Sequence, residues 1–263
     1  MSSTVLGIIP ARWGATRFPG KPLALIAGKP LVQRVWERAR AARRLDRVLL
    51  ATDDRRIADA ARDFGAEIVM TSPTHPSGTD RIAEAAQLYQ AQLGTAQTIS
   101  HVINIQGDEP TIDPGLIDAL ADALRADPEL AMITAANPLR ELAELHNPNC
   151  VKVVRARDGR ALYFSRSAIP HLPAGSTELD PAVTYLRHQG IYGYASDFLA
   201  DFVRWPPSPL ERAERLEQLR ALENGARIQV LVTERVSLGV DAPEDVPRVE
   251  AELKRLEAAG ADC

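Results

Sequence analysis

The chain has 263 residues, of which 45% are hydrophobic and 25% charged, and its formal net charge is −4. These values are typical of a globular protein, and the acidic balance argues against a nucleic-acid partner, which requires a basic surface. No apolar segment approaches the roughly 20 residues of a membrane helix, and the N-terminus lacks a signal-peptide pattern. Cys150 and Cys263 show neither disulfide nor metal-ligand spacing. We therefore expect a cytoplasmic protein.

Strands and helices alternate in the first half of the chain. Short apolar runs predict buried strands, and amphipathic spacing between them predicts helices. This order is typical of a parallel sheet with right-handed crossovers. The strands are expected at 5–9, 48–51, 67–70, 102–105 and 131–135, and the helices at 31–39, 54–65, 78–93 and 114–125.

The pattern changes near Asn147. Two apolar runs separated by Asp158-Gly159 predict a β-hairpin, and a long Pro-rich segment follows, as is usual for a binding loop or a subunit contact. We expect one domain over 1–263, with an antiparallel excursion at about 150–200. The remaining elements are a strand at 189–194, a helix at Pro209–Leu222, a strand at 228–232 and a closing helix.

Polar residues follow the predicted strand 102–105 without a gap. Gln106, Asp108 and Glu109 stand where this strand leaves the sheet. In open parallel sheets, ligands bind outside the carboxyl ends of the strands, and carboxylates there suit a cation. The same residues could equally form a solvated loop before helix 114–125, with Asp113 as its N-cap.

The loop after the first strand, residues 10–22, is basic. It contains Arg12, Arg17 and Lys21 with two glycines and no acidic residue. Such a loop suits a polyphosphate, because cations and backbone N–H groups can converge on phosphate oxygens. The pattern is neither the dinucleotide-binding glycine motif nor the Walker A loop. A solvated basic turn is the alternative.

Two helix entrances carry polar residues with two possible meanings. Asp53-Asp54 favours an N-cap and a first-turn dipole partner over a metal site. Ser77-Gly78-Thr79 is also a capping arrangement, although its backbone N–H groups could approach a base or a phosphate closely.

A series of motifs in a fixed order resembles the 3-deoxy-manno-octulosonate cytidylyltransferases, the CMP-Kdo synthetases of lipopolysaccharide biosynthesis. The resemblance spans nearly the whole chain and implies a three-layer α/β/α fold with a mostly parallel mixed sheet, similar to the nucleotide-diphospho-sugar transferases. The chain departs from the usual family pattern at Trp13, Asp80 and Ala242. The motifs are Ile9–Arg12, Arg17–Pro22, Ser77–Thr79, Asn104–Pro110, Asn147–Asn149, Ala161–Arg166, Arg187-His188, Gly190–Tyr194, Pro209–Glu211, Leu216–Arg220 and Gly239–Asp241.

The resemblance implies an enzyme that transfers CMP from CTP to 3-deoxy-D-manno-octulosonate (Kdo) and releases pyrophosphate. Asp108 and Asp241 match the ligands of Mg²⁺, the implied cofactor, which needs only two carboxylates besides water and phosphate oxygens. Lys21 and Arg12 match the groups that stabilise the phosphates, which makes these four residues the catalytic set. The nucleotide-binding residues are Ala11, Arg12, Arg17, Lys21, Ser77, Gly78 and Arg81.

The resemblance also implies sugar-binding residues, and we expect a homodimer; the charge and the apolar runs give no reason to expect a nucleic-acid or membrane partner. An Arg opposite the sugar carboxylate is chemically sensible, because it can pair bidentately. Without the resemblance, His188 and Glu217 are better explained as ordinary structural or surface residues. The implied set is Gln106, Arg166, His188, Tyr192, Glu217 and Gln218.

Three alternatives belong to other substrate or protein classes. The first is a cytidylyltransferase for another acidic sugar, such as a sialic acid. The second is a related glycosyltransferase, which would release a nucleoside diphosphate in place of pyrophosphate. The third is a binding protein without catalytic activity.

Overall fold

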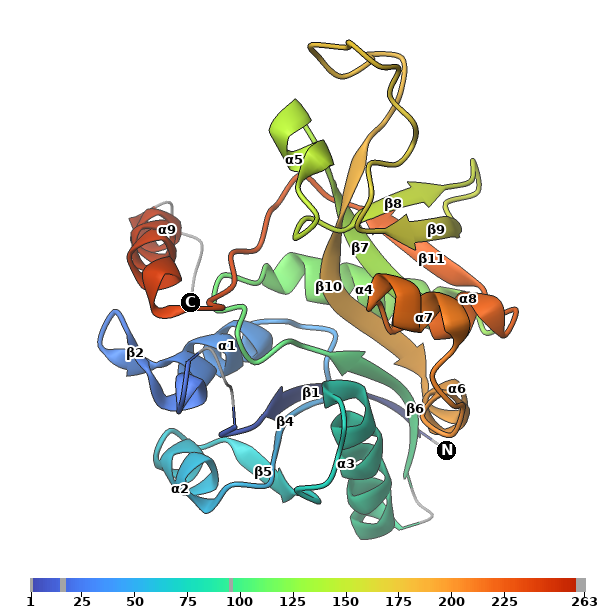
Figure 1. Cartoon of the computed structure of the whole chain (residues 1–263). Helices are drawn as coiled ribbons and strands as arrows, with labels where there is room; N and C mark the ends of the chain where they lie inside the picture. The colour runs from blue at the N-terminus through green and yellow to red at the C-terminus, as the bar shows by residue number, and fades with distance from the viewer. Residues whose placement is uncertain (1, 15–17, 95–96, 259–263) are drawn as a thin grey trace. The chain divides into compact units, whose positions relative to one another are not determined.

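A computed structural model describes residues 2–14, 18–94 and 97–258 of the chain (Figure 1). The predicted basic residue Arg17 therefore lies outside the described residues. The chain forms two compact units, which we call the first unit (Met1–Arg125 with Ser237–Cys263) and the second unit (Ala126–Val236). No linker-like composition marks this division in the sequence.

The first unit is built on four parallel strands in the order β6-β1-β4-β5. These strands are β1 (Ser2–Ala11), β4 (Arg47–Thr52), β5 (Glu67–Met70) and β6 (Gln97–Asn104). Ile8 of β1 is opposite Asn104 of β6, and Ala11 is opposite Thr52 of β4. The carboxyl ends of neighbouring strands therefore meet at one edge, and the loops that follow them share that edge.

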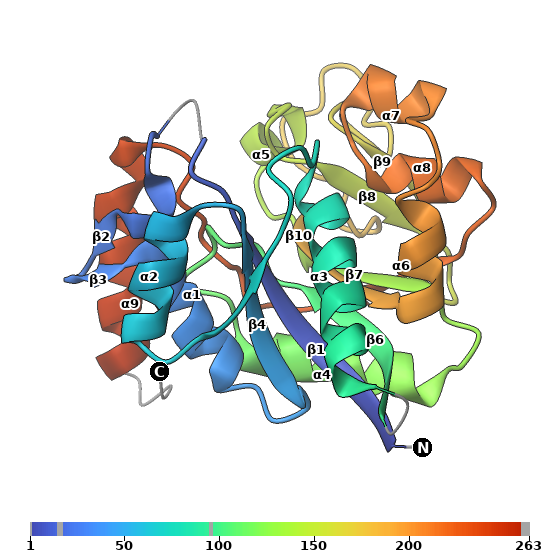
Figure 2. The ribbon, with the colours of Figure 1, turned by 90° about the horizontal axis from the view of Figure 1, so that it is seen from below.

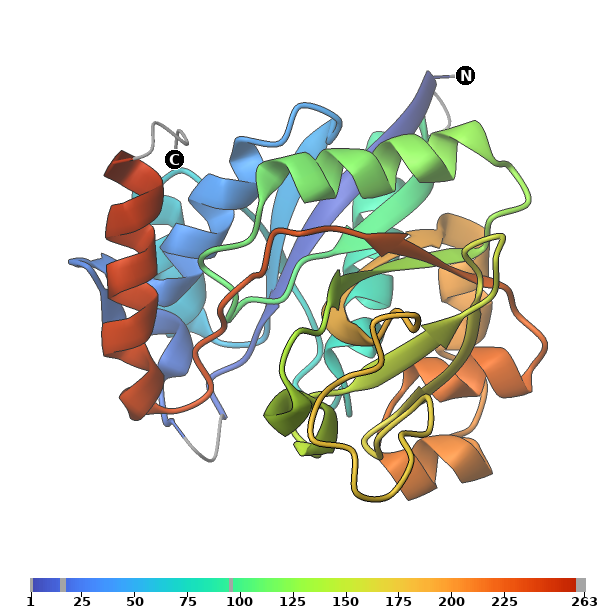
Figure 3. The ribbon, with the colours of Figure 1, turned by 90° about the horizontal axis from the view of Figure 1, so that it is seen from above.

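Helices cover both faces of these strands. α3 (Gly78–Leu93) lies on one face, and α1 (Leu31–Arg40) and α4 (Pro114–Ala126) lie on the other, as the views from opposite sides show (Figures 2 and 3). The carboxylate of Asp118 in α4 accepts the backbone N–H groups of Arg43 and Arg44 after α1, which joins these two helices. The remaining elements of the unit are η1 (Lys21–Leu23), β2 (Leu25–Ile26), β3 (Lys29–Pro30), α2 (Arg55–Asp63), η2 (Pro243–Asp245) and α9 (Val246–Ala258).

The second unit contains the antiparallel excursion. β7 (Met132–Pro138) pairs in parallel with β11 (Ile228–Val232) and antiparallel with β10 (Leu186–Ala195). The predicted hairpin is present as β8 (Lys152–Arg155) and β9 (Ala161–Ser165), and β8 also pairs with β10. The second unit also contains two short helices that the sequence analysis missed. They are α5 (Leu142–His146) and α6 (Ser196–Phe202).

The prediction of a single helix at Pro209–Leu222 is wrong. The segment forms α7 (Pro209–Glu214) and α8 (Gln218–Glu223), and Arg215 between them has a φ of 54°. Arg220 reaches back to Glu211 with two hydrogen bonds of 2.6 and 2.8 Å, so the two helices are held as a bent pair. The apolar spacing that suggested one helix does not describe α7, which has no buried residue.

The predicted fold class is confirmed: a mixed, mostly parallel sheet has helices on both sides and carries an antiparallel excursion. The strands form because their apolar side chains are buried, as at Ile8, Leu50 and Ile103, which have no exposed surface. Among the described helices, none is both long and apolar enough to cross a membrane.

Candidate active site

A pocket of about 330 Å³ lies in the first unit, at the edge where β1 and β6 end. Nine residues predicted for the site line it: Ala11, Arg12, Lys21, Ser77, Gly78, Arg81, Gln106, Asp108 and Asp241. Five lining residues were not predicted: Pro10, Pro22, His75, Pro76 and Gly107. Pro10, Pro22 and Gly107 lie inside motifs named above without an assigned role, and His75 and Pro76 directly precede the Ser77 motif. None of the five is an Asp, Glu, Lys or Arg, whose charge would have marked it.

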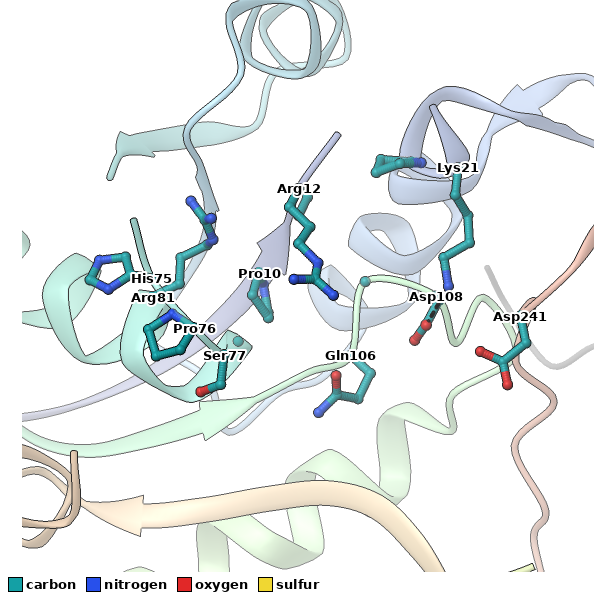
Figure 4. A pocket seen from close by; sticks show the side chains of 14 residues that line it. Pro10, Arg12, Lys21, His75, Pro76, Ser77, Arg81, Gln106, Asp108 and Asp241 are labelled. Atoms are coloured by element: carbon teal, nitrogen blue, oxygen red, sulfur yellow. Dashed lines mark hydrogen bonds and ion pairs between the residues drawn. The ribbon is translucent and has the colours of Figure 1, made fainter. Parts of the chain in front are cut away.

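The pocket is ordered along its length (Figure 4). Ser77 and Arg81 lie toward one end, Arg12 and Gln106 lie between, and the carboxylates lie toward the other end. The groups around Ser77 that can hold a base are thus separated from the carboxylates that can hold a cation, which are described next with Lys21.

Lys21 and two acidic residues form the carboxylate end. The Lys21 ammonium donates to Oδ2 of Asp108 at 2.7 Å and to the carbonyl oxygen of Val240 at 2.9 Å. The Val240 N–H in turn donates to the carbonyl oxygen of Asp108 at 2.9 Å, which places the loop carrying Asp241 beside the end of β6. Gly20 precedes Lys21 with a φ of 69°, a conformation suited to glycine, and so turns η1 toward the pocket.

A further carboxylate fixes the loop of Asp241. Asp245 accepts the backbone N–H groups of Asp241 and Ala242 at 2.8 and 3.0 Å. Burial alone would raise the pKa of the Asp245 carboxyl, but these N–H groups and the nearby Arg248 outweigh it, and the pKa is lowered. Asp245 therefore stays ionised and holds the backbone of Asp241.

The carboxylate pair suits a magnesium ion. Asp108 and Asp241 line the same pocket, and oxygen donors are the ligands that Mg²⁺ prefers. The described residues contain no group of three or more His, Cys, Asp or Glu side chains arranged for a metal. A two-carboxylate set leaves coordination positions for water and substrate oxygens, as is usual for Mg²⁺.

Glycine is required where β1 and β6 end side by side. A Cβ atom at Gly107 would lie 2.6 Å from the carbonyl oxygen of Pro10, which is closer than real Cβ atoms approach backbone oxygen. The absence of a side chain therefore allows the first loop and the Gln106–Asp108 turn to meet.

Ser77 is the N-cap of α3, as one of the two readings of its motif predicted. Its hydroxyl accepts the backbone N–H groups of Thr79 and Asp80 at 3.1 and 3.2 Å. Gly78 follows it in the first turn and also lines the pocket. Capping and pocket lining therefore coincide here.

The aspartate pair before α2 is only partly a cap. Asp54 accepts the Arg56 N–H at 2.9 Å and caps the helix as predicted. Asp53 instead lies 3.1 Å from Nη1 of Arg81, so the prediction that it serves the helix dipole is corrected. A buried guanidinium needs a charged or polar partner more than an exposed helix end does.

The second unit contains five of the residues predicted for sugar binding. His188 and Tyr192 of β10 are neighbours, with ring centroids 5.4 Å apart. Arg166 follows β9 and donates to the carbonyl oxygens of Glu214 and Pro148 at 2.9 and 3.0 Å. Gln218 is 3% exposed, and its Nε2 has no hydrogen-bond partner among the described residues. Glu217 is adjacent and lies 3.7 Å from Arg220.

His188 is a neutral side chain. Burial lowers the pKa of its imidazole from 6.5 to about 3. Its Nε2 is 2.9 Å from the Thr134 hydroxyl, which itself donates to the carbonyl oxygen of Ile191 at 2.7 Å. The hydroxyl oxygen therefore accepts from Nε2–H, which leaves Nδ1 of His188 as a hydrogen-bond acceptor for a sugar hydroxyl and leaves the side chain without a positive charge.

This burial predicts a pH dependence of folding. Between about pH 3 and pH 6.5 the unfolded chain binds a proton at His188 that the folded chain excludes, so this group lowers stability as the pH falls through that range. We expect His188→Gln to remove about 2 kcal/mol of the difference in unfolding free energy between pH 7 and pH 5. Urea unfolding of both proteins at the two pH values measures it, and equal pH differences would contradict the burial of a neutral imidazole.

Comparisons with known proteins identify the family of the chain. The sequence profile described as "Cytidylyltransferase" matches residues 6–228. A protein of Syntrophotalea carbinolica named 3-deoxy-manno-octulosonate cytidylyltransferase is 51% identical, over 96% of this chain and 100% of its own length. A protein of the same name from Pseudomonas syringae pv. syringae is 50% identical, over 97% of this chain and 100% of its own.

The chain is also similar to solved structures. One described as CMP:2-keto-3-deoxy-manno-octonic acid synthetase complexed with CTP has a TM-score of 0.86 and 38% identity, covering 96% of this chain and 99% of its own. A cytidylyltransferase from Leptospira borgpetersenii, with a TM-score of 0.61 and 16% identity, shares the fold. With half of its residues identical to those of relatives that it covers from end to end, the chain belongs to the 3-deoxy-manno-octulosonate cytidylyltransferase family of nucleotidyltransferases.

Proposed function

We infer that this chain transfers CMP from CTP to Kdo and releases pyrophosphate. The anomeric hydroxyl oxygen of the sugar forms a bond to the α-phosphorus as the bond from that phosphorus to the bridging oxygen breaks. Negative charge accumulates on the phosphates, so catalysis depends on positioning and on neutralising this charge. The observation that carries the proposal is the arrangement of the first-unit pocket, in which cations and carboxylates share one strand edge.

The order of side chains along the pocket fits a nucleoside triphosphate. Backbone and side-chain groups around Ser77 and Arg81 suit the base, and Arg12 and Lys21 suit the phosphates. Lys21 is 15% exposed and tethered at two points, so its charge is held at a defined place. A fixed ammonium stabilises developing charge without reorganisation during the reaction.

We propose that Asp108 and Asp241 hold Mg²⁺ when substrates bind. The ion would orient the phosphate and the sugar hydroxyl and ease ionisation of that hydroxyl. Asp108 already has a cation beside it, because the Lys21 ammonium contacts its Oδ2 at 2.7 Å. A carboxylate has two oxygens and can contact the ammonium and the ion together, although the ammonium weakens its attraction for a second cation.

The role of the second-unit residues in sugar binding stays a prediction. The buried amide of Gln218 supports it, because an unpaired buried N–H₂ group is unfavourable unless a ligand or water accepts from it. Arg166 supports it as well. Its guanidinium donates to the backbone carbonyl oxygens of Glu214, Pro148 and Arg215, which hold it in place. The expectations of a cytoplasmic homodimer and of a product used in lipopolysaccharide biosynthesis are likewise part of the proposal.

One assay separates these readings. The protein is incubated with CTP, Mg²⁺ and Kdo, and pyrophosphate is measured, with sialic acid and 8-amino-Kdo in parallel reactions. We expect pyrophosphate with Kdo and less with the other sugars. A preference for another sugar would change the substrate, release of nucleoside diphosphate would indicate a glycosyltransferase relative, and no turnover would favour a binding protein.

A further inference from the structure

Arg81 is an unusual residue for the base end of the pocket. It belongs to the first turn of α3, it is only 3% exposed, and it lines the pocket. A guanidinium removed from water is unfavourable unless its N–H groups find partners. Its Nη1 donates to the Thr71 hydroxyl at 2.6 Å and lies 3.1 Å from Oδ1 of Asp53.

Asp53 depends on this contact in turn. Its Oδ1 is buried and has no well-aligned hydrogen bond within the described part of the chain, so the charge of Arg81 is what compensates it. The neighbouring Asp54 differs, since it caps α2 and pairs with Arg56 at 2.6 Å. The two adjacent aspartates therefore have different partners: Asp53 contacts Arg81, and Asp54 caps α2 and contacts Arg56. Asp53 has no part in helix capping or in the proposed catalysis.

We propose that Asp53 is a positioning residue for the nucleotide: its carboxylate, together with Thr71, fixes the plane of the Arg81 guanidinium at the base end of the pocket. Arginine carries five N–H donors in one rigid plane, so two anchors on Nη1 determine where the other donors point. Asp53 acts on the nucleotide only through Arg81. This inference rests on the proposed function, because it takes CTP as the ligand of the pocket.

The chemistry of the bases gives a selective readout. Cytosine presents acceptors at N3 and O2, whereas uracil presents an N–H donor at N3, so a fixed row of N–H donors favours cytosine. If the guanidinium can rotate, its donors no longer favour cytosine over uracil, whereas its positive charge still attracts phosphate. Loss of Asp53 should therefore weaken CTP binding more than UTP binding.

The experiment compares Asp53→Asn with Asp54→Asn, because the two variants change adjacent residues in the same way. Calorimetric titration with CTP and with UTP, both with Mg²⁺, gives the affinities. We expect Asp53→Asn to raise the Kd for CTP about tenfold or more and to reduce the CTP-to-UTP preference. Its kcat at saturating CTP and its KM for Kdo should stay within about threefold of wild type. Asp54→Asn keeps a favourable N-cap residue and loses only the pair with the exposed Arg56, so its Tm should stay near that of wild type and both affinities within about twofold.

The outcomes decide the proposal. A folded Asp53→Asn protein with wild-type affinity and base preference would overturn it, as would equal losses in both variants, which indicate a structural role only. If Asp53→Asn does not fold, Thr71→Val removes the other anchor, and unchanged base preference in that variant would overturn the proposal as well. Wild-type protein that binds CTP without turnover with Kdo would refute the proposed reaction and leave the comparison of affinities intact.

Discussion

Replacement of Asp108 or Asp241 by Asn is expected to lower kcat for CMP transfer by about 10²–10³-fold, the largest effect that we predict. The exchange keeps the size of each side chain but removes a carboxylate from the one end of the pocket that can hold a cation. For Asp241→Asn, we also expect the Mg²⁺ concentration at half-maximal rate to rise about tenfold or more. Pyrophosphate release at varied Mg²⁺ measures both quantities.

The control for these variants is Asp122→Asn. Asp122 is in the same unit, is half-exposed and pairs with Arg44 on the surface at 3.1 Å. A surface pair of this kind contributes little to stability, so turnover and Mg²⁺ dependence should match wild type. If either active-site variant turned over CTP at the wild-type rate with the same Mg²⁺ dependence, the assignment of the metal ligands would be wrong.

Lys21→Ala is expected to lower kcat about 10²-fold while the apparent KM for Kdo changes little. The ammonium is needed most when charge develops on the departing pyrophosphate, so its loss affects the transition state more than sugar binding. The structure adds a second reason: without Lys21, the Asp108 carboxylate loses its partner at 2.7 Å and the Val240 carbonyl loses its donor. Steady-state kinetics with Kdo varied at saturating CTP separates kcat from KM.

Lys29 offers a matched control for Lys21. Its ammonium also contacts a carboxylate at 2.7 Å, that of Glu37, but it is 44% exposed and lies outside the pocket. Lys29→Ala should therefore leave both kinetic constants at wild-type values. A Lys21→Ala enzyme that needed more Kdo but kept its kcat would show that Lys21 serves binding and not charge stabilisation.

The strands of this fold are predictable because buried strands consist of short runs of consecutive apolar residues. The runs 67–70 and 228–232 coincide with β5 and β11, and the hairpin after Asn147 was also found. The bend at Arg215 was not found, since a left-handed backbone at a non-glycine residue leaves no pattern in apolar spacing. The contact of Arg220 with Glu211, a tertiary interaction, holds the two helices across this bend.

The site was predictable for a different reason. Charged groups at strand ends are unusual enough to suggest use at Arg12, Lys21 and Asp108, whereas the family resemblance was needed to imply Ala11, Arg81 and Asp241. Nine predicted residues line one pocket, although their roles stay predictions. Residues that act through others leave no such signal. Asp53 next to Asp54 looks like a helix cap in sequence, and only the distance to Arg81, a residue 28 positions away, distinguishes them.

The two aspartates after β4 also constrain how this loop can vary. The backbone leaves the strand extended, with Asp54 at φ −108° and ψ 123°, and successive side chains of extended chain point to opposite sides. Insertion or deletion of a single amino acid between Thr52 and Asp54 would shift which carboxylate points toward Arg81 and which caps α2. Homologous proteins can therefore be expected to keep the length of this connection even where its other residues diverge.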